Sequence, residues 1–297
     1  MGVKMLPGLK SLLQNCAVVS IPLKTAFRGM SVRESMLLFN GNRSGEWSAF
    51  PEYSDYAAAK WLASALEQAY LYTDIDVAGN VQDISVNATL PNMGPGQMQE
   101  WWHRFPGAKS VKMKVAEQGS SVDEDVHRVE ALRKTVGEDI QIRLDANGRW
   151  SLSEAETAIT ALERFSIEYI EQPVKSIEEM AELRKMVSGT DTGIAADESI
   201  RQPNGLERVV ASSAADLIVL KVSPLGGIVP TLDIARRAHS SQLGVVISSA
   251  LETSVGLSWG IRAAALLREE LGSLRDAGLG TAVFFEEDVV DKPLNVR

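Results

Sequence analysis

Five charged residues of this 297-residue chain each follow a short apolar segment, at intervals of 24 to 31 residues. In chain order they are Lys114, Asp145, Glu171, Asp197 and Lys221. Each interval is about the length of one strand and one helix, so the five side chains would end successive strands. Carboxylates are hard oxygen ligands, and the convergence of three predicts a site for Mg²⁺, with Mn²⁺ as a substitute. Unrelated helix N-caps explain any one of the carboxylates, but not the regular spacing of three.

Lysines flank these carboxylates on both sides. Lys112 and Lys114 stand two residues apart on one predicted strand, so their side chains share a face. Burial and a neighbouring cation both disfavour a charged amine, so we expect a lowered lysine pKa and a general base here. Lys221 is expected to reach the same region from another strand. Cations on two sides suit removal of a proton next to a carboxylate, because positive charge stabilises the resulting enediolate. The competing interpretation places these lysines at exposed strand edges.

The intervening chain alternates short apolar segments with longer amphipathic ones, which is typical of βαβ units and a parallel sheet. In a barrel the strand ends converge on one mouth, whereas a doubly wound sheet spreads them along an edge. The pattern therefore favours a barrel over residues 83–282. Its predicted strands are 84–90, 110–115, 141–145, 168–171, 193–197, 217–222 and 245–248. Helices are predicted over 121–136, 153–165 and 176–186, the last two with capping boxes of Ser153 with Glu156 and Ser176 with Glu179.

Residues 1–82 show a different pattern and are predicted to form a small α+β domain. Strands are expected near 18–23 and 36–38, with turns at Gly41-Asn42 and Gly45, before an alanine-rich helix over 56–70. The C-terminal tail, 283–297, is apolar and then acidic. It is expected to return to this first domain as a last strand.

Composition limits the classes of partner. The chain carries 30 Lys+Arg and 39 Asp+Glu, a net charge of −9, so nucleic acids and anionic membranes are poor partners. No apolar run approaches the roughly 18 residues that span a bilayer. The single cysteine, Cys16, indicates a reducing, cytoplasmic location. His103, His127 and His239 are predicted to be structural or exposed. A small carboxylate substrate and a monomer are the favoured partner and state.

Six segments carry a resemblance to a known family. They are Val111-Lys-Met-Lys114, Arg143-Leu-Asp-Ala-Asn-Gly148, Tyr169-Ile-Glu-Gln-Pro173, Ala195-Ala-Asp-Glu-Ser199, Leu220-Lys-Val-Ser-Pro-Leu-Gly-Gly-Ile228 and Ser248-Ser-Ala-Leu-Glu-Thr-Ser-Val-Gly256. In this order they resemble the enolase superfamily and, within it, the o-succinylbenzoate synthases of menaquinone biosynthesis. The resemblance covers nearly the whole chain. It implies an α/β fold, a (β/α)7β barrel with an N-terminal α+β capping domain.

The resemblance also implies roles for individual residues. Asp145, Glu171 and Asp197 would bind Mg²⁺. Lys114 would be the acid/base catalyst, and Lys221 would stabilise the enediolate from the opposite face. The implied reaction is the dehydration of 2-succinyl-6-hydroxy-2,4-cyclohexadiene-1-carboxylate to o-succinylbenzoate. The residues that the resemblance assigns to substrate contacts or to the secondary site are Lys112, Arg143, Asn147, Ser248, Ser249, Glu252, Arg28 and Phe50.

Other functions of the same superfamily remain open at this stage. Dipeptide epimerases, N-succinylamino-acid racemases and muconate cycloisomerases share these lysines and carboxylates, and a racemase needs both lysines as bases. The chain length and the Ser-Ser-Ala-Leu-Glu segment (248–252) favour the synthase. A non-catalytic barrel would be expected to have lost some of these charged residues, and all five are present.

Overall fold

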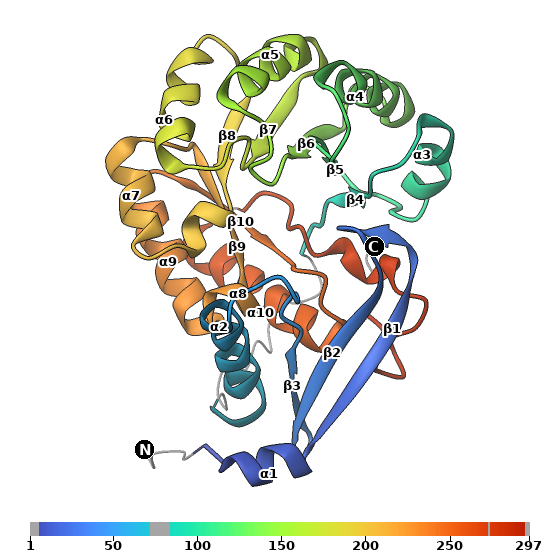
Figure 1. The fold of residues 1–297 in the computed structure, drawn as a ribbon, viewed down its shortest axis with the longest axis vertical. Coiled ribbons are helices and arrows are strands. Elements are labelled where there is room, and N and C mark those ends of the chain that lie inside the picture. Colours follow the sequence, from blue (N-terminus) through green and yellow to red (C-terminus); the bar gives the residue numbers. More distant parts are fainter. Residues whose placement is uncertain (1–5, 72–83, 273, 295–297) are drawn as a thin grey trace.

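The computed structural model describes residues 6–71, 84–272 and 274–294, which form a barrel and a smaller N-terminal domain (Figure 1). Seven parallel strands form the barrel sheet in the order β10-β9-β8-β7-β6-β5-β4. Each strand lies beside its predecessor in the chain, as successive β-α units require. The strands are β4 Ala88–Leu90, β5 Ser110–Lys114, β6 Gln141–Asp145, β7 Ile167–Glu171, β8 Gly193–Ala196, β9 Leu217–Lys221 and β10 Gly244–Ser248.

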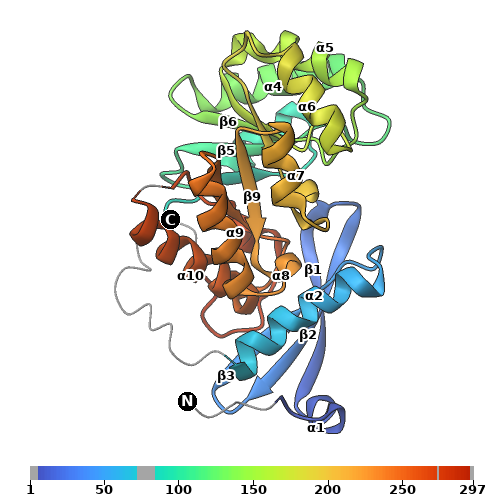
Figure 2. The same cartoon turned by 90° about the vertical axis from the view of Figure 1, so that its left-hand side faces the viewer.

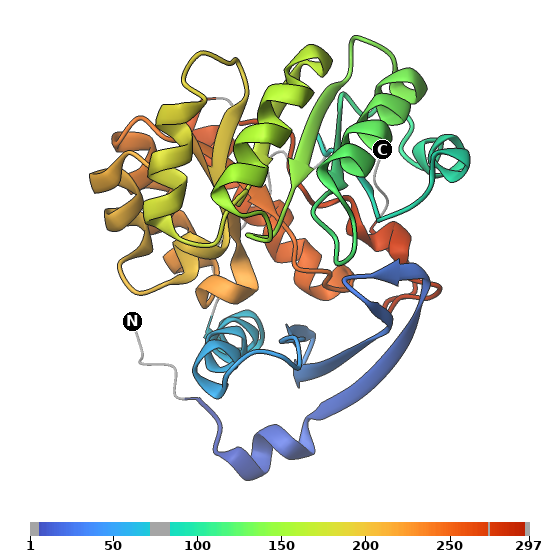
Figure 3. The ribbon, with the colours of Figure 1, turned by 45° about the horizontal axis from the view of Figure 1, so that its top comes forward.

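Helices connect these strands and cover the outside of the sheet (Figure 3). In α4, Ser121 and Glu124 form a capping box, and Arg133 and Lys134 in the last turn complement the helix dipole. The α-helices are α3 Pro95–Trp102, α4 Val122–Val136, α5 Leu152–Leu162, α6 Ile177–Met186, α7 Gly205–Ser212, α8 Val222–Leu225, α9 Ile228–Ser240 and α10 Ser254–Leu271. The 3-10 helices are η3 Glu163–Phe165, η4 Glu198–Arg201 and η5 Gly280–Phe284.

Two residues join the two edges of the parallel sheet. Ala277 forms a parallel bridge with Val86, just before β4, and Gly278 forms one with Ser248 at the end of β10. The N–H of Asn87 donates to the carbonyl of Ala277, which ties this segment to the start of β4. Residues 277–278 therefore stand where an eighth strand would close the barrel.

The barrel strands are buried on both faces. All residues of β5 and β9 are buried, lysines included, because helices cover one face and side chains fill the interior. A small apolar cluster occupies part of the interior and includes Tyr169, Leu217 and Val246. The charged side chains of the strand ends lie on the same inner face and must be satisfied by one another.

The N-terminal domain packs against one side of the barrel (Figure 2). Its antiparallel sheet has the order β1-β2-β3, and the turns at Arg28-Gly29 and Gly41 adopt positive φ. Helix α2 packs on the short helix α8 of the barrel. The elements are α1 Leu9–Gln14, β1 Cys16–Phe27, β2 Met30–Asn40, β3 Arg43–Trp47, α2 Asp55–Leu66 and the π-helix η1 Glu67–Leu71.

Two carboxylates of the N-terminal domain reach the amino ends of barrel helices. The carboxylate of Glu46, which is fully buried, accepts hydrogen bonds from the N–H groups of Thr253 and Gly256 at the start of α10. The carboxylate of Glu67 accepts from the N–H groups of Ile228 and Val229 at the start of α9, at 2.6 and 3.3 Å. Helix amino ends carry unpaired N–H groups and partial positive charge, so these carboxylates stabilise both helices.

Most predicted elements agree with the structure. The predicted fold class, an α/β barrel preceded by an α+β domain, is confirmed. Each predicted barrel strand overlaps an observed one, and β7 and β10 begin one residue earlier than predicted. The first strand is much shorter than expected, since only 88–90 of 84–90 form a strand and Val86 makes an isolated bridge. The capping box of α5 is formed by Ser151 and Glu154, not by Ser153 and Glu156. Gly45 lies within β3 rather than in a turn.

Several smaller predictions concern the rest of the chain. The predicted boundary at 82/83 lies outside the described residues. The tail meets the first domain where Phe285 bridges Leu23. All three histidines are exposed, as predicted. Within the part of the chain that the structure describes, no helix has the length and apolar character needed to cross a bilayer.

Candidate active site

The strand register brings the predicted carboxylates to one level of the barrel. Lys114 is paired with Asp145 across β5 and β6, and Asp145 is paired with Glu171 across β6 and β7. Glu171 is paired with Ala195, so Asp197 lies two residues beyond this level, directly after β8. The carboxyl ends of parallel strands open at the same end of a barrel. The three carboxylates therefore stand side by side at the barrel mouth.

Lysine ammonium groups connect these carboxylates in a continuous chain of opposite charges. Lys114 Nζ lies 2.6 Å from Asp145 Oδ2. Lys112 Nζ lies 2.7 Å from Glu171 Oε2 and 3.7 Å from Asp145 Oδ2, so it is shared between two carboxylates. Lys221 Nζ is shared likewise, since it contacts Asp197 Oδ2 and lies 3.5 Å from Glu171 Oε1.

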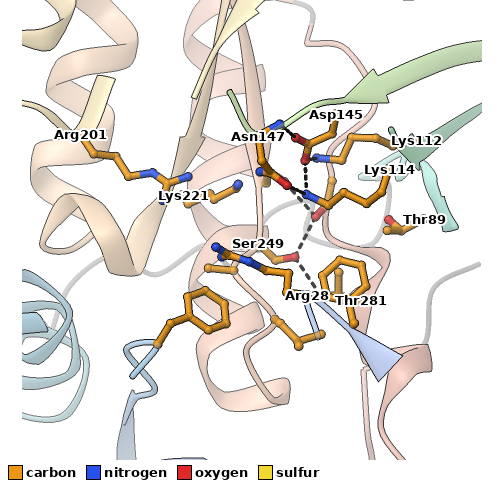
Figure 4. Close-up of a pocket in the computed structure, with 16 residues that line it drawn as sticks. Arg28, Thr89, Lys112, Lys114, Asp145, Asn147, Arg201, Lys221, Ser249 and Thr281 are labelled. Carbon is orange, nitrogen blue, oxygen red and sulfur yellow. Dashed lines mark hydrogen bonds and ion pairs between the residues drawn. The ribbon is translucent and has the colours of Figure 1, made fainter. Parts of the chain in front are cut away.

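The lysines approach from opposite sides of the mouth. In Figure 4, Lys112 and Lys114 reach the centre from one side, and Lys221 reaches it from the other. The Nζ of Lys114 also donates to Oδ1 of Asn147, which follows Asp145 by two residues. Asn147 adopts φ of 49°, in the left-handed region, and this turn brings its amide back over the lysine. The prediction that the lysines lie at an inner mouth rather than at an exposed edge is therefore confirmed.

Burial and charge act differently on the three lysines. Burial lowers the pKa of Lys114, and the neighbouring ammonium of Lys112 adds to this, so the attraction of Asp145 does not restore it. Burial also disfavours the charged form of Lys112, but the carboxylates of Glu171 and Asp145 outweigh burial and raise its pKa. The pKa of Lys221 is raised in the same way, because Asp197 and Glu171 outweigh burial. Lys114 is thus the amine most easily made neutral.

The carboxylates divide in a similar manner. Burial and the nearby charge of Asp145 raise the pKa of Glu171 to about 7. Burial opposes ionisation of Asp145 as well, but Lys114 and Lys112 hold its pKa at about 2. The pKa of Asp197 is lowered despite burial, because Arg201 and Lys221 both contact it. Glu171 is the carboxylate whose charge is least compensated by the protein.

The three carboxylates offer the donor set that a hard divalent cation prefers. In the described residues, no three carboxylate, histidine or cysteine groups already face a common point that could hold an ion. Instead, a lysine occupies the space between each neighbouring pair of carboxylates, as the distances above show. The residues present fit such an ion by their chemistry, since three buried carboxylates are neighbours and are now compensated by ammonium groups alone or with Arg201.

A pocket of about 490 Å³, part of it open to solvent, lies over this charge chain. Barrel and N-terminal domain both contribute to it, so the pocket lies between them. Glu171 and Asp197 lie below the pocket surface and are almost fully buried. The predicted residues that line the pocket are Lys112, Lys114, Asp145, Asn147, Lys221, Ser248, Ser249, Arg28 and Phe50.

Comparison with known proteins agrees with this architecture. Residues 97–297 match the family described as enolase C-terminal domain-like, and residues 18–69 match enolase N-terminal domain-like. The chain belongs to the enolase superfamily. A protein named o-succinylbenzoate synthase from Mycobacterium tuberculosis is 44% identical over 291 residues, which cover 97% of this chain and 84% of the relative.

Solved structures of the superfamily share the fold. The L-Ala-D/L-Glu epimerase of Bacillus subtilis is 24% identical with a TM-score of 0.77, and the alignment covers 92% of this chain and 90% of the epimerase. A dipeptide epimerase of Enterococcus faecalis, solved with Mg and a dipeptide, is 23% identical with a TM-score of 0.75 and coverage of 95% and 93%. At these identities the likeness concerns the fold.

Two residues predicted to contact substrate lie elsewhere in this enolase-superfamily barrel. Arg143 is two residues below Asp145 on the inner face of β6, where its Nε donates to Glu168 Oε2 at 2.6 Å and its Nη1 donates to the carbonyl of Asp276. Its backbone is paired with that of Lys112, but its guanidinium contacts Glu168, Asn87 and Asp276 toward the amino ends of the strands. We call this end of the barrel the floor. Glu252 turns away from the pocket and accepts a hydrogen bond from the N–H of Ala250. Neither residue lines the pocket, so their assignment to substrate contact stays a prediction without support from this geometry.

The structure also adds residues that the sequence analysis missed. Arg201 contacts Asp197 and donates to the hydroxyl of Tyr53, so it links a barrel strand end to the N-terminal domain. Its position four residues after Asp197, on a helical turn, was the available signal. Thr89 and Thr281 line the pocket with hydroxyl groups, and neither stands in a motif that points to the mouth of an enolase-superfamily barrel.

Proposed function

We propose that this protein is an o-succinylbenzoate synthase, a lyase that dehydrates 2-succinyl-6-hydroxy-2,4-cyclohexadiene-1-carboxylate to o-succinylbenzoate. The observation that carries the proposal is the 44% identity to proteins of that name over 97% of the chain. The site geometry supports it, because buried carboxylates stand between lysines approaching from two sides.

We propose that Asp145, Glu171 and Asp197 hold Mg²⁺, for which Mn²⁺ could substitute. When bound, this ion would supply positive charge to the substrate carboxylate and so stabilise the anion formed by proton loss. The raised pKa of Glu171 supports a cation here, since an ion would offset the repulsion from Asp145 that disfavours its charge.

Lys114 is proposed as the acid and base. Burial favours its neutral amine, which can accept the proton from the carbon next to the substrate carboxylate. The same ammonium then returns that proton to the departing hydroxyl, which leaves as water. Asp145 and Asn147 hold the amine in position for both transfers, because each accepts a hydrogen bond from Nζ.

Lys221 and Lys112 are proposed to act through fixed positive charge. The pKa of each is raised, because burial is outweighed by neighbouring carboxylates, so both stay protonated. Fixed ammonium groups stabilise negative charge that develops on the substrate carboxylate without reorganising. We propose that Arg28, Phe50, Ser248 and Ser249, which line the same pocket, contact the remainder of the substrate.

The location, state and domain limits of the protein are also proposals. The single free cysteine, Cys16, supports a cytoplasmic location. We propose a monomer that acts on a small molecule rather than on nucleic acid or membranes, given the acidic composition. A barrel over 83–282 and a domain of 1–82 joined by the tail 283–297 are consistent with the bridge between Leu23 and Phe285.

Dehydration of the cyclohexadiene substrate, followed by ultraviolet absorbance, tests the proposed function. We expect turnover with Mg²⁺, its loss in EDTA, and its recovery when Mg²⁺ is added back. The alternative activities, dipeptide epimerisation and N-succinylamino-acid racemisation, are tested by deuterium incorporation at Cα in D₂O. Rapid deuterium incorporation into a dipeptide, together with no dehydration, would replace the synthase assignment by that of an epimerase.

A further inference from the structure

A buried arginine of the N-terminal domain contacts the barrel beside the pocket. Arg33 lies in the middle of β2 and is only 2% exposed. Its Nε donates to the carbonyl of Leu251 at 3.0 Å, and its Nη2 donates to the carbonyls of Ala250, at 3.3 Å, and Ser48. Burying a guanidinium is unfavourable unless its donors are satisfied. Here main-chain carbonyls from two segments, one in each domain, accept these hydrogen bonds.

The groups that Arg33 contacts form a wall of the pocket, which we call the Phe50 wall: Phe50, Ala250 and Leu251. All three line the pocket. The guanidinium carbon of Arg33 lies 4.2 Å from the centre of the Phe50 ring, as does that of Arg28. Arg28 lines the pocket, whereas Arg33 contacts the wall from outside the pocket lining. A cation over an aromatic ring is attracted to it, so Arg33 holds the ring as well as the loop.

The loop in this wall has a backbone conformation that needs support. Leu251 adopts φ of 62°, in the left-handed region that a branched side chain rarely occupies. Such a conformation persists only where the surroundings determine it. The hydrogen bond from Arg33 Nε fixes the Leu251 carbonyl, and the carboxylate of Glu46 fixes the N–H of Thr253, two residues later.

We propose that Arg33 is a positioning residue that shapes the Phe50 wall and thereby sets the affinity for substrate. This inference rests on the proposed function only for the choice of substrate. The guanidinium joins a ring of the N-terminal domain to a loop of the barrel within this one wall, from outside the pocket lining. The candidate metal ligands and Lys114 lie on β5 to β7 and directly after β8, and Arg33 does not contact them in the described structure. The chemical step should therefore be affected less than binding.

The test compares Arg33→Met and Arg33→Lys with the unchanged protein. Methionine retains the apolar stem and removes the fork, and we expect the KM for the cyclohexadiene substrate to rise about tenfold to a hundredfold, with kcat changed about threefold at most. Lysine keeps the charge but cannot span several carbonyls, so Arg33→Lys should recover only part of the affinity. If Arg33→Met folds poorly, the KM of Arg33→Lys still tests the proposal. The matched control is Arg104→Met, which removes another arginine that stacks on an aromatic ring, at 4.6 Å from Trp101.

A second measurement is independent of the substrate. Hydrogen exchange read by mass spectrometry should show faster exchange in residues 249–257 of Arg33→Met, with the helices α4 to α6 unchanged. If the protein shows no dehydration, the proposed function fails, while the exchange result still decides the role of Arg33. A KM for Arg33→Met equal to that of the unchanged protein, whether or not kcat falls, would overturn the proposal. Unchanged hydrogen exchange in residues 249–257 would overturn it as well.

Discussion

Both ends of the barrel contain buried charged side chains, but the charges are organised differently. At the floor, Arg143 meets one carboxylate, that of Glu168, and its Nη1 donates to Oδ1 of Asn87 and to the carbonyl of Asp276. At the mouth, Lys112 and Lys221 are each shared between two carboxylates. The floor is a satisfied network, whereas the mouth holds cations whose partners could be exchanged.

The difference shows which buried charges are suited to chemistry. A fully satisfied network stabilises one arrangement and offers nothing to a ligand. At the mouth, burial lowers the pKa of Lys114, whereas carboxylates outweigh burial and raise the pKa of Lys112, only two residues away. A pocket also reaches both lysines. Ammonium groups shared between carboxylates and opposed pKa shifts of neighbouring lysines together distinguish the mouth from the floor.

The largest expected effect comes from removing the proposed base at the mouth. Lys114→Ala should lower kcat by about 10⁴-fold, because a positioned acid and base contributes up to that factor. Product binding should persist, since the other cations remain. Steady-state kinetics and titration of o-succinylbenzoate measure the two effects. If Lys114→Ala turned over substrate at nearly the rate of the unchanged protein, Lys114 would not be the acid and base. The proposed chemical role of the mouth would then lack its main support.

At the floor, a substitution should affect stability rather than chemistry. Arg143→Met removes one of the two arginine partners of Glu168, the other being Arg275. It also leaves the Oδ1 of Asn87 and the carbonyl of Asp276 without this donor, and with three hydrogen bonds lost we expect the free energy of unfolding to fall by about 3–5 kcal/mol. The exposed pair of Arg149 with Glu117 provides the control, since Arg149→Met should cost less than about 1 kcal/mol. Denaturant unfolding measures both. A folded Arg143→Met protein that had lost its turnover would contradict the distinction between the two ends.

The smallest effect expected is stabilisation by the metal ion. Mg²⁺ at 100 times its Kd should add about 2.7 kcal/mol to the free energy of unfolding, and Glu171→Gln should lose most of this gain. The control is Glu168→Gln, which changes a floor carboxylate on the same strand, β7, and should keep the gain. Thermal unfolding with and without Mg²⁺ measures it. Equal gains in both variants would show that Glu171 is not a ligand.

The pH dependence of that gain has a defined sign. A raised pKa for Glu171 means that its contribution to the metal-free fold is fully present below the pKa of the unfolded chain and is lost as pH rises through about 7. Protons and Mg²⁺ compete for this carboxylate, so the stabilisation by Mg²⁺ should grow as pH rises through the same range.

The sequence predicted site residues correctly where a charged residue both followed an apolar segment and stood at the end of that predicted strand. The five charged strand ends were found because each directly follows an apolar segment. Arg143 was expected at the pocket, which it does not line, for a physical reason: alternation along a strand places it on the same face as Asp145 but does not say which end of the barrel its side chain reaches. Ser151 and Ser153 are each followed by glutamate three residues later, so the motif alone could not choose between them.

Contacts across long stretches of chain could not be predicted at all. Arg33 lies in an ordinary alternating strand, and the carbonyls of Ala250 and Leu251 are more than 200 residues away. A backbone carbonyl has no sequence signature, because every residue carries one. Thr89 and Thr281 could not be predicted either, because these two residues, far apart in the chain, line one pocket only once the barrel has formed.

The carboxylates of Glu46 and Glu67 have a consequence for attempts to recombine such proteins. Each accepts hydrogen bonds from the amino end of a barrel helix, α10 or α9, and neither helix belongs to the domain that supplies the carboxylate. A chimaera that joins this barrel to a first domain with uncharged residues at these two places would leave two sets of buried N–H groups without acceptors. A domain chosen for grafting should therefore carry an acidic residue at each of these two positions, and this requirement comes before the choice of its loops.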